Sequence, residues 1–493
     1  MQLYDKDLLS VQEVRELVEA AKEAQKELAG MSQAQVDHIV RAIADAGVRN
    51  ARRLAEMAHE DTGFGKVEDK IIKNVFGSQC VYEYIRDMKT MGEVGRDDEK
   101  KLRTIAVPVG VIAGLIPSTN PTSTALYKAE IAVKAGNAIV FSPHPTALRC
   151  ILETVKVIRQ AISEAGGNEN LVSCITIPTM EATDNLMRHR DISMILATGG
   201  SAMVRAAYSS GTPAIGVGPG NGPSYLEKTC DLPLAIKRIL DSKTFDNGTI
   251  CASEQSIICD EEMVPAVRSE MEKQGAYFLR EEEREQLGRF ILRANGTMNP
   301  EIVGRSVETI AKLAGLANVP ASARVLVARE DGVGRGHPYS NEKLCPILAF
   351  FTGTDYRDVC EKVCTILHYE GAGHTFSMHT KDDAIVEYFA RRVPASRILV
   401  NTASALGGIG GTTGLMPSLT LGCGAVGGSA TSENVGPMQL LNLRYVAYGT
   451  RELGEIRAGV PDCSDGICRV AGGFTEADVD DIVRKIMTRL RGM

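Results

Sequence analysis

The sequence has no uninterrupted run of about 18 apolar residues, the length that a membrane-spanning helix needs. It also lacks a basic N-terminal segment followed by an apolar stretch, so we expect no secretory signal. The formal net charge is −7, with a sequence pI near 5.8, so no basic field favours nucleic acid as a partner. These absences together predict a cytoplasmic protein with neither a membrane nor a nucleic-acid partner.

Tryptophan is absent and aromatic residues make up only 5% of the chain, whereas glycine is abundant, with 48 residues. This excess of glycine indicates many close backbone approaches, as nucleotide sites need. There are 12 cysteines, but no two of them form a CxxC pair. A chain of 493 residues can build hydrophobic cores without a disulfide framework, so we expect the thiols to stay reduced.

The hydrophobic pattern predicts an α/β fold. In roughly the first 95 residues, apolar side chains recur at helical spacing, from Val11 to Leu28 and from Ala34 to Met57. From residue 105 onward, short apolar runs alternate with helical segments, which is typical of a parallel sheet covered on both faces. We expect N-terminal helices and a dinucleotide-binding domain over residues 1–230, and a second α/β domain over residues 231–425.

The C-terminal part of the chain reads as a separate segment. Turn-forming clusters and a Gly-Gly pair predict a linker over residues 456–474. Residues 475–493 predict an amphipathic helix with acids in its first turns and bases in its last. Its apolar stripe is formed by Val479, Ile482, Val483, Ile486 and Leu490. This helix either docks on another protein or packs on its own domain or a sister subunit.

One cysteine is a candidate nucleophile. Cys251 lies in the segment FDNGTICASEQ, where a polar, glycine-containing turn comes just before an expected helix start. Backbone N–H groups at a helix N-terminus favour the thiolate, the form that attacks carbonyl groups. An ordinary buried cysteine is the alternative interpretation.

Two further segments supply groups that such chemistry needs. Asn120 follows an expected strand within IPSTNP and could donate a hydrogen bond to a developing oxyanion, although a turn residue before proline is the alternative. The segment ATGGSA at 197–202 joins a strand end to a helix start, which suits a phosphate group. The glycine-rich stretch at 216–223 does not fit the G-x-G-x-x-G fingerprint.

In this order, these segments resemble the CoA-acylating branch of the aldehyde dehydrogenase superfamily, the acetaldehyde and propionaldehyde dehydrogenases. The resemblance covers about residues 10–450. FDNGTICASEQ is similar to the nucleophile motif, STNP to the oxyanion segment and ATGGS to the cofactor turn. EKLCP at 342–346 resembles the element whose glutamate holds the nicotinamide ribose, and YEGAGHT at 369–375 and LTLGCG at 419–424 are also similar to this branch.

The resemblance implies roles for individual residues. Cys251 and Asn120 would be catalytic, and His374 is a candidate for contact with substrate or CoA, although an ordinary loop histidine is the alternative. The implied cofactor contacts are Ser142, His144, Thr198, Gly199, Gly200, Ser201 and Glu342. We expect no metal, because the Cys360, Cys364 and His368 spacing also fits a buried helix stripe.

Two departures from the wider superfamily refine the expected activity. Hydrolytic members carry a glutamate in an E-L-G-G-K segment, and Val217 stands at that position here. A valine cannot act as a general base, so the thioester should pass to a CoA thiol rather than to water. The K-P-S-E ribose segment is replaced by SPHP at 142–145, and the missing lysine favours NAD over NADP.

The resemblance therefore implies oxidation of a short aldehyde to acyl-CoA with NAD and CoA. Acetaldehyde is the first choice; propionaldehyde, sulfoacetaldehyde, a non-acylating enzyme and an inactive scaffold are the alternatives. The family's three-part fold implies a small β-arm that forms dimers or tetramers, with strands near 100–110 and 439–450 in a return segment over 426–455. The helix at 475–493 resembles encapsulation peptides that bind the shell or cargo proteins of bacterial microcompartments, which would place the enzyme inside one.

Overall fold

The computed structural model describes residues 5–293, 296–459, 479–481, 483–485 and 487. The chain divides into two compact units, one of Met1–Met91 with Val107–Asn442 and one of Gly92–Ala106 with Leu443–Met493. The larger unit contains two parallel sheets with helices packed on them, which confirms the predicted α/β class. No helix in the described ranges is both long and apolar enough to cross a bilayer.

The N-terminal helices follow the predicted stripes, with one difference. They are α1 (Lys6–Ala29), α2 (Gln33–Arg49), α3 (Ala51–Thr62), α4 (Val67–Val75) and α5 (Val81–Ile85), with a π-helical turn η1 (Phe76–Cys80) between the last two. The segment expected as one helix from Ala34 to Met57 is broken at Asn50. The Asn50 side chain donates to the Ala46 carbonyl, and its backbone leaves the helical region at φ −103°.

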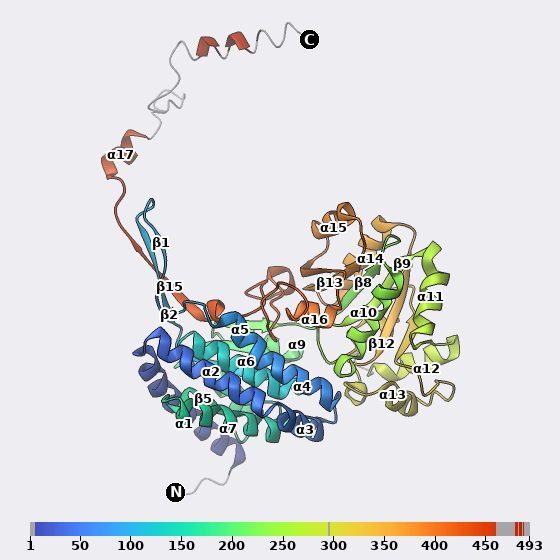
Figure 1. Cartoon of the computed structure of the whole chain (residues 1–493), viewed down its shortest axis with the longest axis horizontal. Helices are drawn as coiled ribbons and strands as arrows, with labels where there is room; N and C mark the ends of the chain where they lie inside the picture. Colours follow the sequence, from blue (N-terminus) through green and yellow to red (C-terminus); the bar gives the residue numbers. More distant parts are fainter. Residues whose placement is uncertain (1–4, 294–295, 460–478, 482, 486, 488–493) are drawn as a thin grey trace. The chain divides into compact units, whose positions relative to one another are not determined.

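The first sheet is parallel, with strand order β5-β4-β3-β6-β7. Its strands are β3 (Val111–Ile116), β4 (Ala138–Pro143), β5 (Val172–Cys174), β6 (Ile192–Thr198) and β7 (Ala214–Val217). Helices α1, α6 (Pro121–Lys134) and α7 (Leu148–Glu164) pack against β3, β4 and β5 (Figure 1). Two shorter helices, α8 (Met180–Arg188) and α9 (Ser201–Ser209), contact β6.

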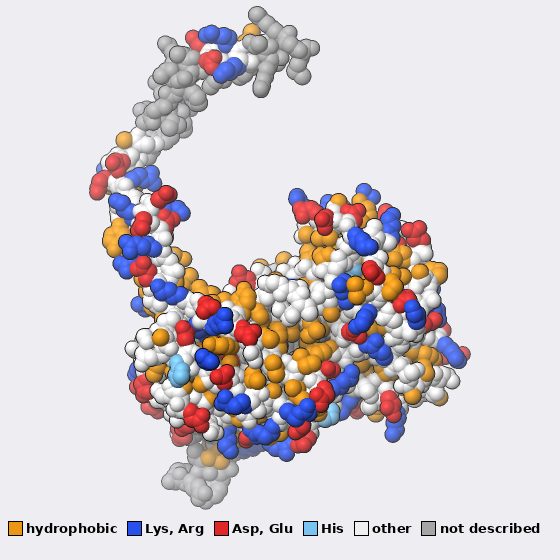
Figure 2. Space-filling model, viewed as in Figure 1, with side chains coloured by type: hydrophobic (Ala, Val, Ile, Leu, Met, Phe, Trp, Pro, Cys, Tyr) orange, Lys and Arg blue, Asp and Glu red, His pale blue; other side chains and the backbone are white. Residues whose placement is uncertain are grey.

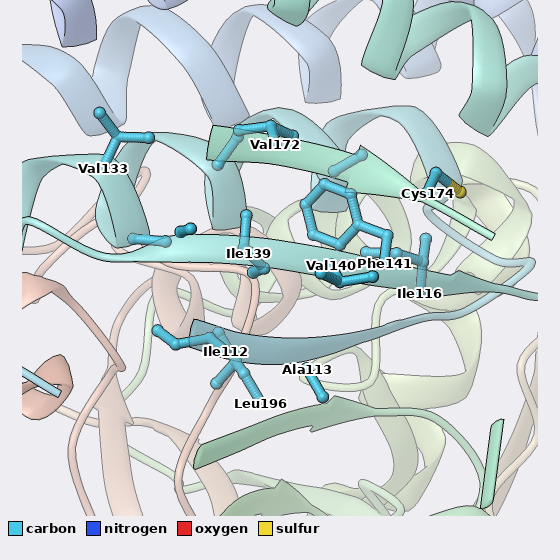
Figure 3. Packing of buried hydrophobic residues seen from close by; sticks show 14 of the residues in the cluster. Ile112, Ala113, Ile116, Val133, Ile139, Val140, Phe141, Val172, Cys174 and Leu196 are labelled. Atoms are coloured by element: carbon cyan, nitrogen blue, oxygen red, sulfur yellow. The ribbon is translucent and has the colours of Figure 1, made fainter. Parts of the chain in front are cut away.

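The core of this sheet is closely packed. Figure 3 shows the ring of Phe141 and the side chains of Ile139 and Val172 filling the space beside the strands. A Cβ on Gly114 would stand 2.6 Å from Phe141 Cδ1, so this strand needs glycine opposite the ring. Such burial contributes about 25 cal/mol for each Å² of apolar surface removed from water, so the sheet forms a firm base for the loops at its edge.

The second sheet is also parallel, with order β10-β11-β12-β9-β8-β13-β14. Its strands are β8 (Gly222–Leu226), β9 (Glu254–Asp260), β10 (Ala276–Phe278), β11 (Val325–Arg329), β12 (Ile347–Gly353), β13 (Gly373–His379) and β14 (Ala395–Val400). Because β8 pairs with β9 and β13, the break between the sheets falls between β7 and β8 rather than at residue 230. The apolar run of β8 alone could not tell which sheet it joins.

The helices of this part are α10 (Leu232–Thr244), α11 (Val264–Lys273), α12 (Glu281–Ile291), α13 (Val307–Ala314), α14 (Tyr356–Tyr369), α15 (Asp383–Ala390) and α16 (Ser404–Gly408). On α14, Cys360 packs in the hydrophobic core. Cys364 is half-buried, and His368 Nδ1 faces the Cys364 carbonyl oxygen at 2.8 Å. These contacts correspond to the helix-stripe interpretation of the two cysteines.

The smaller unit contains a three-stranded sheet with order β1-β2-β15. Its strands are β1 (Gly92–Asp97), β2 (Leu102–Pro108) and β15 (Leu441–Ala447), and α17 (Leu453–Ala458) follows. Two of the strands stand at the expected positions, whereas β1 was not expected, and α17 occupies the first residues of the expected linker. The rest of that linker and most of the terminal helix lie outside the described residues.

Surface charges are of mixed sign on the face that Figure 2 shows. Many are paired one helical turn apart, as Arg268 with Glu272 and Arg391 with Glu387. Exposed pairs of this kind contribute at most about 1 kcal/mol each. Surface ion pairs of this kind therefore contribute little to the stability of the fold, compared with the buried sheets.

Candidate active site

Most of the predicted site residues line one cavity of about 510 Å³ in the larger unit. Its wall includes Asn120, His144, Thr198, Gly199, Gly200, Ser201, Cys251 and Glu342. Another cavity, of about 540 Å³ between α1 and α7, is as large but is lined by none of the predicted residues. The chemistry of the lining, rather than the size of the cavity, therefore identifies the candidate site.

Cys251 is held by a loop between α10 and β9. Three successive residues before it have left-handed backbone, with φ 47° at Asp246, 52° at Asn247 and 78° at Gly248. The expected helix after Cys251 is wrong, because the chain enters strand β9 at Glu254. Burial raises the pKa of the Cys251 thiol to about 12, and the nearby Glu342 adds to this effect. The resting thiol is therefore protonated and needs a proton acceptor.

His374 is that acceptor by position. It lies at the start of β13, fully buried behind Cys251, with its Nε2 3.2 Å from the Cys251 sulfur. Its Nδ1 lies 2.9 Å from Thr375 Oγ1, which fits the tautomer that donates from Nδ1 and leaves Nε2 free to accept. Burial, with the nearby Arg397, lowers the pKa of His374 well below its usual value near 6.5, so the ring is neutral.

Arg397 on β14 is a buried cation that the sequence analysis missed. Its Nη2 donates to the carbonyl oxygens of His374 at 2.9 Å and Gly422 at 2.7 Å. Within the described ranges, no carboxylate lies within 4.0 Å of its guanidinium nitrogens. The charge therefore acts on Cys251 and His374, favouring the thiolate of one and the neutral form of the other. An arginine inside the run ASRILV was the available signal.

Asn120 stands at the N-cap of α6 but does not cap that helix. Its Nδ2 instead donates to the Thr249 carbonyl at 3.2 Å, two residues before Cys251, and its Oδ1 accepts from Lys73 Nζ at 2.6 Å. The donor end of the amide is thus directed toward the nucleophile loop. The hydrogen-bond donor that an oxyanion requires is present at the cavity wall.

The cavity also has a cradle suited to a dinucleotide. Strand β6 ends at Thr198, and α9 begins at Ser201. The N-cap residue of α9 is Gly200, which has no side chain that could cap the helix. The first N–H groups of α9 are thus available to phosphate oxygens. The carboxylate of Glu342 accepts from the Gly220 N–H at 2.8 Å and lines the same cavity, where it could accept from ribose hydroxyls. These residues fit an NAD-type cofactor.

Two of the expected cofactor contacts differ from each other in placement. His144 lines the cavity and accepts from the Thr146 N–H at 3.2 Å. Ser142 does not line it, because its side chain is buried and lies 2.8 Å from Thr183 Oγ1. The cofactor contact expected for Ser142 therefore stays a prediction, because its hydroxyl is turned to Thr183 rather than to the cavity.

Val217 ends β7, is 4% exposed and lines the cavity within the hydrophobic cluster that contacts Cys251. Two carboxyl groups, those of Glu342 and Glu370, line the same cavity. Glu370 accepts from the Glu342 N–H at 2.6 Å. Burial, followed by the charge of Glu370, raises the pKa of Glu342 to about 8, which leaves it largely protonated at neutral pH. At the position where hydrolytic members carry a glutamate, Val217 places an apolar side chain in the cavity wall.

Comparisons with known proteins agree with this geometry. A family model described as the aldehyde dehydrogenase family matches residues 3–291. The bifunctional aldehyde-alcohol dehydrogenase of Escherichia coli (strain K12) is 44% identical over 443 residues, covering 89% of this chain and 50% of that protein. The chain thus spans about half the length of the curated relatives that it matches first.

Solved structures match over most of their length. A probable aldehyde dehydrogenase from Listeria monocytogenes EGD-e is 61% identical, with a TM-score of 0.91 over 92% of this chain and 100% of that one. An acetylating aldehyde dehydrogenase from Geobacillus thermoglucosidasius is 49% identical, with a TM-score of 0.90 over 92% and 99%. A propionaldehyde dehydrogenase from the Clostridium phytofermentans fucose utilisation bacterial microcompartment is 28% identical, with a TM-score of 0.80 over 88% and 97%.

Proposed function

Because the chain belongs to the aldehyde dehydrogenase family, we propose that it is a CoA-acylating member that oxidises a short-chain aldehyde with NAD. Acetaldehyde is the first choice of substrate, and propionaldehyde and sulfoacetaldehyde are alternatives. The observation that carries the proposal is the Cys251–His374 pair, in which Cys251 lines the cavity and His374 lies buried next to its sulfur. Val217 lines the same cavity at the position where hydrolytic members carry a glutamate.

The chain's own residues perform the first step. His374 Nε2 takes the thiol proton while the Cys251 sulfur bonds to the aldehyde carbon. Asn120 Nδ2 and the Cys251 backbone N–H stabilise the resulting oxyanion. A nicotinamide cofactor held by residues 198–201 and Glu342 would supply the hydride acceptor, and loss of the hydride would leave a thioester on Cys251. The proton on His374 then leaves to solvent.

The second step needs a thiol rather than water. The CoA sulfur attacks the thioester carbon, and the Cys251 sulfur leaves as the acyl group passes to CoA. His374 accepts the CoA thiol proton and returns it to Cys251, so the site ends in its starting state. Val217 offers no lone pair to activate water, which supports CoA rather than water as the acceptor.

The assembly and cellular location are proposed from the smaller unit and the C-terminal segment. The strands β1, β2 and β15 would join copies of the chain into a dimer or tetramer, since Leu443 and Tyr445 on β15 are 41% and 61% exposed. We place the enzyme in the cytoplasm, inside a bacterial microcompartment, through residues 475–493. The resemblance of that segment to encapsulation peptides supports this, as does the microcompartment source of one solved relative.

The test is NADH production from acetaldehyde with and without CoA. The intact protein, a form truncated after Gly473 and Cys251→Ser are compared. We expect CoA-dependent turnover in the first two forms and none in Cys251→Ser. Equal NADH with free acetate in the absence of CoA would indicate a non-acylating enzyme. No turnover with acetaldehyde, propionaldehyde or sulfoacetaldehyde would indicate a scaffold.

A further inference from the structure

A buried ammonium group lies between the nucleophile loop and Asn120. Lys73 on α4 is 2% exposed. Its Nζ lies 2.6 Å from Asn120 Oδ1, 2.5 Å from Asp246 Oδ2 and 2.9 Å from Thr249 Oγ1. An ammonium has three N–H donors, so these three acceptors satisfy it completely. The group is fixed in place rather than free to rotate.

This arrangement decides which way the Asn120 amide points. A lysine ammonium can only donate, so it can face only the oxygen end of the amide. The NH₂ end must then face the Thr249 carbonyl and Thr119 Oγ1, to which it donates at 3.2 and 3.3 Å and which belong to residues of the cavity wall. An asparagine at the N-cap of α6 would ordinarily use its oxygen to cap that helix, and here it does not. The contact with Lys73 replaces the cap.

Asp246 favours the charged form of Lys73 and fixes its position. Burial lowers the pKa of Lys73 to about 8, and the charge of Asp246 opposes that shift, so the group is mostly an ammonium at pH 7. Its carboxylate accepts from Lys73, from Lys70 Nζ at 3.0 Å and from the Lys66 N–H at 2.7 Å. Burial alone would raise the pKa of Asp246, but Lys73 and Lys70 outweigh it and hold that pKa below its ordinary value. The same residue belongs to the left-handed turn that delivers Cys251. One carboxylate thereby fixes both the nucleophile loop and the ammonium.

We propose that Lys73 is a positioning residue that holds the Asn120 amide in its oxyanion-donating orientation. The proposal rests on the proposed acylating function. It predicts that Lys73 acts on the transition state only through Asn120, because Lys73 does not line the cavity. Loss of a single oxyanion donor lowers kcat by about 10²- to 10³-fold, and the loss caused by removing Lys73 is bounded by that figure.

Lys70 provides a matched control. It is a second buried lysine on the same helix, 3% exposed, and it shares the Asp246 carboxylate. Its other contact is with the Thr119 carbonyl at 3.4 Å, and it makes no hydrogen bond with the Asn120 side chain. Removing Lys70 therefore costs a comparable ion pair without freeing the amide.

The experiment is a double-mutant cycle on CoA-dependent acetaldehyde oxidation by the full chain. Lys73→Met is expected to lower kcat by about 10-fold or more while changing the KM for aldehyde less than about 3-fold. In an Asn120→Ala background, the same substitution should change kcat less than about 3-fold, because its target is gone. Lys70→Met should instead have the same fractional effect in both backgrounds. Multiplicative effects of Lys73→Met and Asn120→Ala would overturn the proposal.

Two further readouts separate positioning from loss of structure. Lys73→Gln retains a donor for Asn120 Oδ1 and folds without a buried charge, so it should keep more of kcat than Lys73→Met. Alkylation of Cys251 by iodoacetamide forms no oxyanion and should change less than about 2-fold in both variants. A fall in alkylation that parallels the fall in kcat would indicate a displaced loop and overturn the proposal. A wild-type protein that makes no acyl-CoA would overturn the proposed function itself.

Discussion

The Nε2 atom of His374 lies 3.2 Å from the sulfur of Cys251, and both groups are neutral at rest. Burial raises the pKa of the thiol to about 12 and lowers that of the imidazole well below 6.5. The proton therefore stays on sulfur until a carbonyl group arrives to share the developing charge. This pair differs from a permanent thiolate–imidazolium pair, which would be exposed to oxidation and alkylation.

The first prediction concerns the reactivity of this thiol. Only the thiolate reacts with iodoacetamide, and a thiol with a pKa near 12 is almost fully protonated through the neutral range. The alkylation rate of Cys251 should therefore rise about 10-fold per pH unit between pH 7 and 9, with no plateau. The rate is measured with Cys251→Ser as the background for other thiols. A plateau near pH 8 would contradict the protonated resting state.

The second prediction concerns His374 as the proton acceptor. Replacing it with glutamine removes the acceptor, and kcat should fall by about 10²- to 10⁴-fold. In the wild type, the lowered pKa keeps the ring neutral as the pH falls, so kcat should show no loss near pH 6.5. His368→Gln is the control, because that histidine is exposed on α14. Equal kcat in the two variants would exclude His374 from proton transfer.

Local patterns were enough to predict much of the fold and part of the site. Parallel strands that are apolar throughout predicted both sheets, and the turns after β3 and β6 carried Asn120 and the glycines at 199–200 to the cavity. Asn120 and these glycines line the same cavity because the carboxyl ends of neighbouring parallel strands meet at one edge. Each needed only a short segment of sequence.

The contacts between side chains far apart in the sequence could not be predicted in the same way. Lys73 and Asp246 are 173 positions apart, and His374 and Cys251 are separated by 123. The His374–Cys251 contact depends on β9 and β13 both pairing with β8, and the Lys73–Asp246 contact depends on α4 packing against the turn that contains Asp246. No local period encodes either arrangement. The helix expected after Cys251 was wrong for a related reason, since pairing of β9 with β8 and β12 overrides the local turn and cap signals.

The third prediction tests the role of Val217. Val217→Glu places a carboxylate at the cavity wall, in the hydrophobic cluster that contacts Cys251. There it could take a proton from water, which would then hydrolyse the thioester. NADH production without CoA, with release of free acid, should rise by about 10²-fold over the wild type. Val217→Gln has nearly the same size but no basic oxygen, so it should remain at the wild-type level. Similar rates in the two variants would mean that cavity shape, rather than a missing base, suppresses hydrolysis.

The fourth prediction concerns Gly65, which packs against the carboxylate that anchors the nucleophile loop. Its φ is +70°, and a Cβ there would stand 1.7 Å from Asp246 Oδ1. Gly166 has a similar φ of +81° with nothing within 4 Å of its Cβ position, so it is a matched control. Gly166→Ala should lose about 1 kcal/mol of unfolding free energy from left-handed backbone alone, and kcat should not change.

Gly65→Ala should lose about 3 kcal/mol or more, because overpacking adds to the same backbone cost. The displaced carboxylate would also release Lys73, so kcat should fall together with stability. Thermal unfolding and CoA-dependent turnover of both variants provide the measurement. If Gly65→Ala matched Gly166→Ala in both stability and turnover, Asp246 would be held in place without the close approach of Gly65. That approach would then have no role in activity.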